Sequence, residues 1–354
     1  MKQHTRIGKL DACKWFCTLL VVANHTSPLE SINATADFLL TRVLARVTVP
    51  FFFMVTGYFV LSKAGREHGF PRILTYMKKL AVYYLVLTLL YLPVQLYRTD
   101  WTSAPALFQN ALRGLIFDGT FYHLWYLPAQ LLGLPIAYGV YRLGEKKAFG
   151  IAGILYVVGL FGDSYYGFIE KLPPIKGFYE GMFSLFSYTR NGLFYAPLFL
   201  LLGCKLADKK NSELGVAIGN TVICLILMGV EAILLHVNGM QRHDSMYLLL
   251  PVTMFWWFQT CLALPPGRKE RDSFFLRGPA LVYFLHPMVI LLLRGFVKLS
   301  GLTVLLTVSP LYYLVVMAGS VCMVWLLLKG KKEVEACIRK KSPAEHGWKS
   351  RWKI

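Results

Sequence analysis

The chain has 354 residues, of which 56% are hydrophobic, 15% aromatic and only 16% charged. Soluble domains carry roughly 25% charged and 45–50% apolar residues, so this composition excludes a disordered protein and argues against an ordinary soluble enzyme. The net charge of +19 would suggest nucleic-acid binding in a soluble protein. Membrane proteins, however, concentrate Lys and Arg in their cytoplasmic loops. Because the chain has no helix-turn-helix, zinc-finger or RNA-binding signature, we exclude nucleic acid as a partner.

Apolar stretches of about 18–20 residues recur along the whole chain, which is typical of transmembrane helices. The sequence therefore predicts an all-α fold, a polytopic integral membrane helix bundle in a lipid bilayer. We expect one membrane domain over residues 1–330 and a basic cytoplasmic tail over 331–354. The predicted membrane spans, about ten in number, are 12–28, 42–62, 80–97, 121–141, 149–163, 192–206, 215–236, 246–264, 279–297 and 309–328.

The segments between these spans alternate in charge. Basic residues gather in 63–79, 142–147, 205–210 and 268–277, whereas the segments between these hold few cations. Because positive loops stay on the cytoplasmic side, we expect a multi-pass protein with both termini cytoplasmic. The longest outer connection, 163–191, is a candidate cover for the outer mouth of the bundle.

Two kinds of bound group are not expected in this chain. The seven Cys residues are odd in number, lack metal-ligand spacing and lie mostly in apolar spans, so we predict free thiols and no metal site. The chain also lacks a Walker A motif and a Gly-rich dinucleotide loop, which excludes an ATP-driven pump within it. We expect no cofactor held by this chain itself.

The first span carries two ionisable residues, which are functional candidates because desolvation is costly for a side chain that faces neither a cavity nor a partner. Lys14 and His25 are eleven residues apart, close to three helical turns, and so share a face about 16 Å apart. We predict that both line one water-filled path, with His25 in the outer half. The alternatives are snorkelling of Lys14 to the inner surface and a helix-to-helix hydrogen bond for His25.

The second span carries two arginines and a glycine with structural meaning. Arg42 and Arg46 are four residues apart and share a face, and the deeper Arg46 needs an acceptor. Gly57 permits a kink or a close helix approach. Gly215 and Gly219 in the seventh span match the spacing of a helix-packing motif.

More polar residues gather at the outer ends of the later spans. Those assigned to a substrate site are Arg46, His123, Asp163, Arg190, Asn191, Glu231 and Asp244. Their mixed charge suits a small ligand that carries both signs, such as an amino acid, because arginine binds a carboxylate with two hydrogen bonds. We predict Arg190 on the carboxylate and Asp244 on the ammonium, with Glu231 as the alternative. In the bland alternative, Arg190 and Asp244 pair with each other and pin the outer loops.

Four motifs resemble the integral-membrane acyltransferase-3 family: a basic residue separated from His25 by ten residues, then VPFFFMVTGYF, HLWYL and YFLHP. The resemblance covers nearly the whole chain. It implies transfer of an acyl group from a cytoplasmic acyl-CoA-type donor to a hydroxyl acceptor, with His25 as catalytic general base. It also implies that Lys14, which replaces the family's arginine, attracts the donor phosphates. His286 in YFLHP is predicted nearer the cytoplasmic end, where packing explains it as well as a role does.

A closer resemblance within that family is to the membrane domain of VanT-type serine racemases. It is carried by FYHLWYLPA, GDSYYG, TRNGLFYAPLFL and RHDSMYLLLP. The resemblance implies a bacterial cell membrane and vancomycin resistance of the D-Ala-D-Ser type, in which the membrane domain supplies L-serine to a cytoplasmic racemase. The residues after 330 are too few for a racemase. We therefore expect the racemase, with its pyridoxal phosphate, either as a separate protein or as a domain that this sequence lacks.

Two functions therefore stay open from the sequence. Serine supply is favoured by the VanT-like runs and by the mixed-charge residues. Acyl transfer is favoured by the basic residue and His25 at the family spacing, for which transport alone has no obvious need. An inert membrane anchor ranks last, because it leaves the ionisable residues within the spans unexplained.

Overall fold

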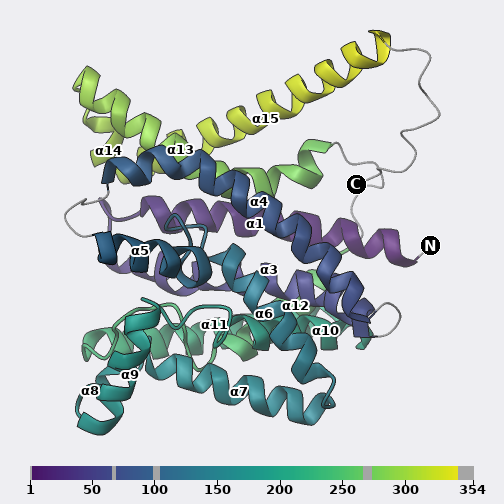
Figure 1. Ribbon diagram of the computed structural model, residues 1–354, viewed down its shortest axis with the longest axis vertical. Helices are drawn as coiled ribbons and strands as arrows, with labels where there is room; N and C mark the ends of the chain where they lie inside the picture. The colour runs from purple at the N-terminus through teal and green to yellow at the C-terminus, as the bar shows by residue number, and fades with distance from the viewer. Residues whose placement is uncertain (1, 66–68, 99–103, 266–272, 342–354) are drawn as a thin grey trace.

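The computed structural model describes residues 2–65, 69–98, 104–265 and 273–341, and Figure 1 shows them as one bundle of helices. These residues form helices and turns, with no strand among them. The expected all-α class is confirmed. The predicted basic loop at 268–271 and the tail residues 342–354 lie outside the described residues.

Each of the ten predicted spans falls on a helix. These helices are α1 (Lys2–Thr26), the stretch 34–61, α4 (Gly69–Arg98), α6 (Tyr126–Tyr141), α7 (Glu145–Phe161), α10 (Ala196–Asp208), α11 (Leu214–Val237), α12 (Leu250–Ala263), α13 (Ser273–Ser300) and α15 (Ser309–Lys341). The stretch 34–61 is continuous and comprises α2 (Ala34–Phe38), η1 (Leu39–Val43), η2 (Leu44–Val47), α3 (Thr48–Thr56) and η3 (Gly57–Leu61). Shorter elements are α5 (Ala104–Arg113), η5 (Gly114–Asp118), α8 (Tyr166–Glu170), α9 (Pro173–Leu185) and α14 (Val304–Thr307).

Five of these helical stretches are long and apolar enough to cross a bilayer, counting only the described residues. They are Ala34–Leu61, Gly69–Tyr97, Leu214–Val237, Phe274–Ser300 and Ser309–Lys331. In α4, α11 and α15, only 22%, 28% and 22% of the most apolar window is buried. Their apolar side chains therefore face outward, where lipid would cover them. The total of ten crossings stays a prediction.

Three helices in the interior of the bundle, α6, α10 and α12, are short, and each begins some residues inside the outer end of the bundle. The 13 residues of α10 extend about 20 Å, whereas the hydrocarbon core of a bilayer is about 30 Å thick. Turns precede these helices, at 119–125, 188–195 and 238–249. Irregular backbone at membrane depth is tolerated where it is buried in protein or lines a cavity. These three turns are therefore the natural walls of a site.

Two glycines allow the second helical stretch to lie against α10. A Cβ at Gly57 would lie 2.0 Å from the carbonyl oxygen of Leu200, and a Cβ at Gly203 would lie 2.0 Å from that of Met54. No other residue fits at either position without moving a backbone. The close approach expected at Gly57 is confirmed.

The prediction that Gly215 and Gly219 pack against another helix is wrong for the part of the chain that the structure describes. Nothing lies within 4 Å of a Cβ built on either glycine. Both residues are exposed on α11. The spacing of small residues is the same as in a packing motif, but this face of the helix points away from the bundle.

Successive long helices alternate in direction, which sorts the loops into two ends (Figure 1). The start of α1, the end of α15 and the short loop 142–144 lie at one end, here called the inner end. The turns before α6, α10 and α12 lie at the other, the outer end. In the connection 163–191, the Gly167 amide donates to the Met240 carbonyl. The Tyr179 hydroxyl donates to the Val158 carbonyl, so α8 and α9 lie beside the bundle.

Candidate functional site

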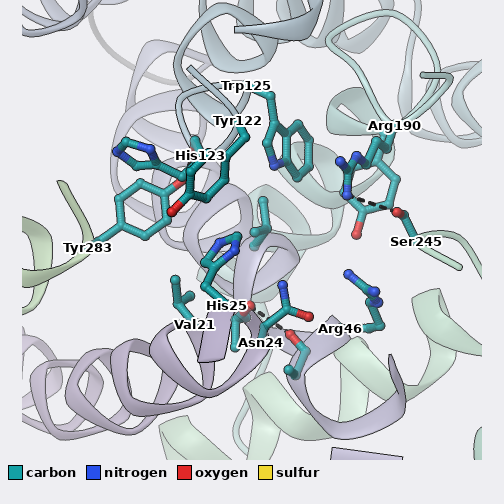
Figure 2. A pocket seen from close by; sticks show the side chains of 14 residues that line it. Val21, Asn24, His25, Arg46, Tyr122, His123, Trp125, Arg190, Ser245 and Tyr283 are labelled. Carbon is teal, nitrogen blue, oxygen red and sulfur yellow. Dashed lines mark hydrogen bonds between the residues drawn. The ribbon is translucent and has the colours of Figure 1, made fainter. Parts of the chain in front are cut away.

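A cavity of about 60 Å³ lies near the outer end of α1 (Figure 2). This space holds a few water molecules or a small polar ligand. The residues that line it are Val21, Asn24, His25, Ala45, Arg46, Thr48, Val49, Tyr122, His123, Trp125, Arg190, Tyr195, Ser245 and Tyr283. The turns before α6, α10 and α12 all contribute to its wall. Of the predicted site residues, His25, Arg46, His123 and Arg190 are brought together here.

Three histidines from three elements meet at one side of the cavity. The ring of His25 stacks on that of His286, with centroids 5.2 Å apart and planes at 26°. The ring of His123 lies 5.7 Å from the same His286 ring. Tyr122 packs edge-on against His25 at 5.0 Å. The prediction that His286 lies nearer the cytoplasmic end is wrong, because its ring contacts that of His25.

Pro287 explains how His286 is held. A proline has no N–H, so the Tyr283 carbonyl four residues earlier lacks its usual helical partner. The Nδ1 of His286 fills this position, 2.8 Å from the Tyr283 oxygen and 3.2 Å from the Val282 oxygen. Because a carbonyl only accepts, Nδ1 carries the proton and Nε2 has a lone pair. That Nε2 is buried and has no partner among the described residues, so it can accept a proton from within the cluster.

Two arginines line the other side of the cavity. Nη2 of Arg46 lies 2.5 Å from Oδ1 of Asp244, and Nη1 of Arg42 lies 3.1 Å from Oδ2 of the same carboxylate. Arg190 donates to the Ser245 hydroxyl at 3.1 Å, and its guanidinium lies over the Trp125 ring at 5.1 Å. Arg190 and Asp244 therefore have different partners. The alternative prediction, that they pair with each other and hold the outer loops, is wrong.

The backbone before Pro50 aims the two arginines at one carboxylate. The helix is a π-helix over Leu39–Val43 and a 3-10 helix over Leu44–Val47. The ring of Pro50 crowds the carbonyl of Arg46 and supplies no N–H to it, so a regular α-helix is disfavoured at this point. Short π-helical turns often lie at functional sites. The predicted shared face of Arg42 and Arg46 is confirmed, since both contact Asp244.

The polar groups around the cavity are incompletely paired. The Nε atoms of Arg46 and Arg190 are buried and have no partner among the described residues, and neither has the side-chain oxygen of Asn24. Burial alone would raise the pKa of Asp244, but Arg46 and Arg42 hold that pKa below its usual range. Asp244 is therefore an ionised carboxylate at neutral pH. Two guanidinium groups share one carboxylate, which leaves donors for an anion.

Two predicted site residues hold the loop 238–249 in place. Asp163 accepts hydrogen bonds from the backbone amides of Ser245 and Met246, at 2.7 and 2.9 Å. Glu231 accepts from the backbone amides of 248 and 249 and from the Tyr165 hydroxyl. Neither residue lines the cavity. Both shape the turn that presents Ser245 and Asp244, and their direct contact with a substrate stays a prediction.

Asn191 and Lys14 also lie away from the cavity wall. Oδ1 of Asn191 accepts from the amides of Leu193 and Phe194, at 2.9 and 3.2 Å, which shapes the turn after Arg190. Lys14 forms an ion pair of 2.8 Å with the buried Asp11. The partnership with a donor phosphate that was predicted for Lys14 stays a prediction.

Sequence reasoning did not assign several residues of the cavity, although most of them lie in motifs already singled out. Trp125 lies in HLWYL, Ser245 in RHDSMY and Tyr283 in YFLHP. His286, also in YFLHP, does not line the cavity but stacks on His25, which does. Asn24 directly precedes His25 and had no signal of its own. Neutral polar and aromatic side chains are ordinary in a membrane helix, so only their position in space separates them from packing residues.

Long helices with exposed apolar faces surround a cavity that contains unpaired donors, which is the arrangement of a membrane protein with a candidate binding site. The family model described as an acyltransferase domain matches residues 7–329. The chain belongs to this acyltransferase-3 family.

Curated relatives with racemase names were also found. Two proteins from Enterococcus faecalis, each named amino-acid racemase, are 39% and 35% identical over 76% and 97% of this chain, which correspond to 38% and 49% of their own lengths. A serine/alanine racemase from Enterococcus gallinarum is 35% identical over 91% of this chain and 46% of its own length. The chain thus spans about half the length of these relatives or less. The resemblance to VanT-type membrane domains is confirmed, and no solved structure matches.

Proposed function

We propose that the protein is a VanT-type membrane component that binds L-serine in the outer cavity and supplies it to a cytoplasmic serine racemase in vancomycin resistance. The unpaired groups of the cavity carry this proposal. Arg46 and Arg190 offer buried N–H donors, and Asn24 offers a buried acceptor. Racemase names among the relatives support the choice of serine as the amino acid.

The binding mode follows from charge. A zwitterion in a low-dielectric pocket must have both charges compensated, because otherwise its desolvation exceeds what the contacts return. The carboxylate lies between Arg46 and Arg190. The ammonium faces the side-chain oxygen of Asn24. The carboxylate of Asp244, which pairs with Arg46 but does not line the cavity itself, compensates the ammonium charge from beside the wall. The serine hydroxyl then lies toward His25, on the opposite side of the cavity (Figure 2).

Acyl transfer is the second candidate, and the pairing of His25 with His286 favours it. A general base must pass on the proton that it takes, and Nε2 of His286 is a buried acceptor beside the His25 ring. His25 takes the proton of an acceptor hydroxyl, and the hydroxyl oxygen attacks the thioester of an acyl-CoA-type donor. An ester forms, the C–S bond breaks, and the leaving thiolate takes up the proton that the hydroxyl gave, so that the free thiol is released. Lys14 serves the donor phosphates at the inner end.

The proposed function also requires a particular location and orientation of the protein. The protein lies in a bacterial cell membrane with both termini cytoplasmic, which puts the inner end beside a cytoplasmic racemase. Pyridoxal phosphate belongs to the racemase, which lies outside this sequence. The outer cavity then takes serine from outside the cell.

The two functions differ in what the full chain does in vesicles. Uptake of radiolabelled L-serine is expected under the first, and hydrolysis of acyl-CoA or acyl transfer to a hydroxyl acceptor under the second. His25→Ala should abolish acyl transfer but reduce serine uptake less severely, because His25 only lines the path. His236→Ala is a matched control, since His236 is exposed at the outer end and does not line the cavity. A His25→Ala protein that is normal in both assays would show that this cavity is not the site.

A further inference from the structure

A second chamber of about 370 Å³ lies against the first cavity. Seven residues line it, namely His25, Phe121, Tyr122, Pro287, Ile290, Leu291 and Arg294. His25 and Tyr122 line both spaces, and Figure 2 shows these two side chains at the border of the first cavity. The imidazole of His25 therefore stands between two compartments. The volume of the second lies within the range of about 300–1,000 Å³ that is usual for ligand pockets.

One stripe of α13 forms the far wall of this chamber. Its four α13 residues, from Pro287 to Arg294, follow the i, i+3, i+4, i+7 spacing of a single helix face. Pro287 and Ile290 are buried, Leu291 is half-buried and Arg294 is exposed. The wall is thus apolar along its depth and cationic at its rim. No carboxylate lines the chamber.

Arg294 is an unusual residue for its position. It lies within the apolar stretch Phe274–Ser300, about 9 Å before the end of that helix. It forms no hydrogen bond or ion pair with the described part of the chain. A charge within a span is costly unless it meets a partner or a cavity. Snorkelling to the bilayer surface would satisfy the charge, but it would not account for the chamber beside it, whose lining residues other than His25, Tyr122 and Arg294 are apolar.

We propose that this second chamber binds an anionic phospholipid from the outer leaflet. The headgroup phosphate pairs with Arg294, and the first carbons of an acyl chain lie against Phe121, Ile290 and Leu291. Charge complementarity selects an anion, because Arg294 is the one charged side chain among the lining residues and no acid opposes it. The apolar wall selects a chain attached to that anion. The proposal goes beyond serine binding, since neither Arg46 nor Arg190 lines this chamber.

Equilibrium binding of fluorescent phosphatidylglycerol to the purified full chain in detergent tests the proposal, with phosphatidylcholine of the same chain length for comparison. Phosphatidylglycerol should bind saturably, and Arg294→Gln should weaken its binding at least tenfold. Lys298→Gln is the matched control, because Lys298 is an exposed cation on the same helix that does not line the chamber. Equal weakening by both substitutions would show only general surface attraction and would overturn the proposal.

A filled chamber gives the second test. Ile290→Trp should block phosphatidylglycerol binding, and Leu291→Trp, at a half-buried position, should do so without strain in the core. Each variant is compared with the wild type by its melting temperature. Octyl phosphate, which has the same anion on a single chain, should displace phosphatidylglycerol from the wild type, at a higher concentration than the lipid itself. If folded Leu291→Trp binds the lipid normally, or if octyl phosphate does not displace it, the chamber is not a site for an anionic amphiphile.

Discussion

Arg190 connects the cavity to the loops that surround it. Its guanidinium donates to Ser245 and lies over the rings of Trp125 and Tyr188, and its buried Nε has no hydrogen-bond partner in the described part of the chain. Arg190→Gln keeps a polar side chain but removes the planar fork that binds a carboxylate. We expect this substitution to weaken serine binding more than tenfold, the equivalent of about 1.4 kcal/mol. Isothermal titration of the purified variant with L-serine measures the change.

Arg113→Gln is the control for this experiment. Among the residues that the structure describes, the Nε of Arg113 also has no partner and its guanidinium donates to one backbone carbonyl, that of Ser184. Arg113 does not line the cavity. Serine affinity should therefore stay as in the wild type. If folded Arg190→Gln binds serine normally, or if its melting temperature collapses, Arg190 holds the loops and does not bind the ligand.

His243 should make the stability of the loop 238–249 depend on pH. Burial, assisted by Arg190 and Arg242, lowers the pKa of His243 to about 4, whereas the unfolded chain has a value of about 6.5. The unfolded state therefore binds more protons between these values. The resulting stability is fully present above about pH 6.5 and is lost as the pH falls toward 4. Thermal melts should show a shallower loss over this range for His243→Gln than for the wild type, and equal slopes would contradict the assignment.

Single residues were predictable where a charge stood in an apolar run. His25 and Arg46 stood out on that basis and Arg190 by its place at the outer end of a span, and all three line the cavity. Glu231 within a span and Asp163 at the end of one stood out in the same two ways, but they bond to backbone amides of one loop. The desolvation cost says that such a residue needs a partner. It does not say whether the partner is a ligand or the protein's own backbone.

The contact between the second helical stretch and α10 depends on two missing side chains. Gly57→Ala would place a Cβ 2.0 Å from the Leu200 carbonyl oxygen, and a backbone oxygen cannot rotate away as a side chain can. We expect a loss of about 1–3 kcal/mol in the free energy of unfolding, the usual cost of overpacking. A lower melting temperature in detergent, or a lower yield of folded protein, reports this loss.

Gly215→Ala provides the comparison, because its Cβ would meet nothing within 4 Å. Alanine is the better helix former by about 1 kcal/mol, so this variant should be as stable as the wild type or slightly more stable. If Gly57→Ala and Gly215→Ala had the same melting temperature, the second helical stretch and α10 would be able to move apart at Gly57 at little cost.

For two helices, the sequence predicted the C-terminal end correctly but not the N-terminal end. The predicted spans 121–141 and 246–264 end within a residue of α6 and α12, but these helices begin several residues later, at Tyr126 and Leu250. The residues before them, such as Phe121 and Tyr247, are apolar and buried. Hydropathy therefore continues through the turn, and only backbone geometry marks where the helix starts.

The threading of the whole chain can be tested from the two ends of the bundle. Single cysteines introduced at Lys171 and Lys146, both exposed, lie at the outer and the inner end. Because basic segments stay in the cytoplasm, an impermeant thiol reagent added to intact cells should label position 171 and not position 146. The native Cys322 is exposed, so the experiment needs a background without native cysteines. The reverse labelling would invert the orientation.

At the scale of the molecule, alternating charge was enough to predict helices that alternate in direction. It could not predict which helices lie inside, because α4 and α10 both carry long apolar runs. The difference lies in contacts that are distant in the sequence. Gly203 on α10 lies against Met54, and Ala196 on α10 lies against Gly133 on α6. The second chamber beside His25 likewise needs α1 and α13 together.

The short inner helices have an electrical consequence. If water fills the outer turns, the membrane potential falls mainly across the inner helices, such as α10 with its 13 residues, and the field there is steeper than in the surrounding bilayer. Carrying one net charge through 100 mV requires about 2.3 kcal/mol. Serine as a zwitterion carries none, so its passage would neither draw on the potential nor discharge it. A charged residue of the site, such as Arg46, would sense the membrane potential if its position changed during the same step.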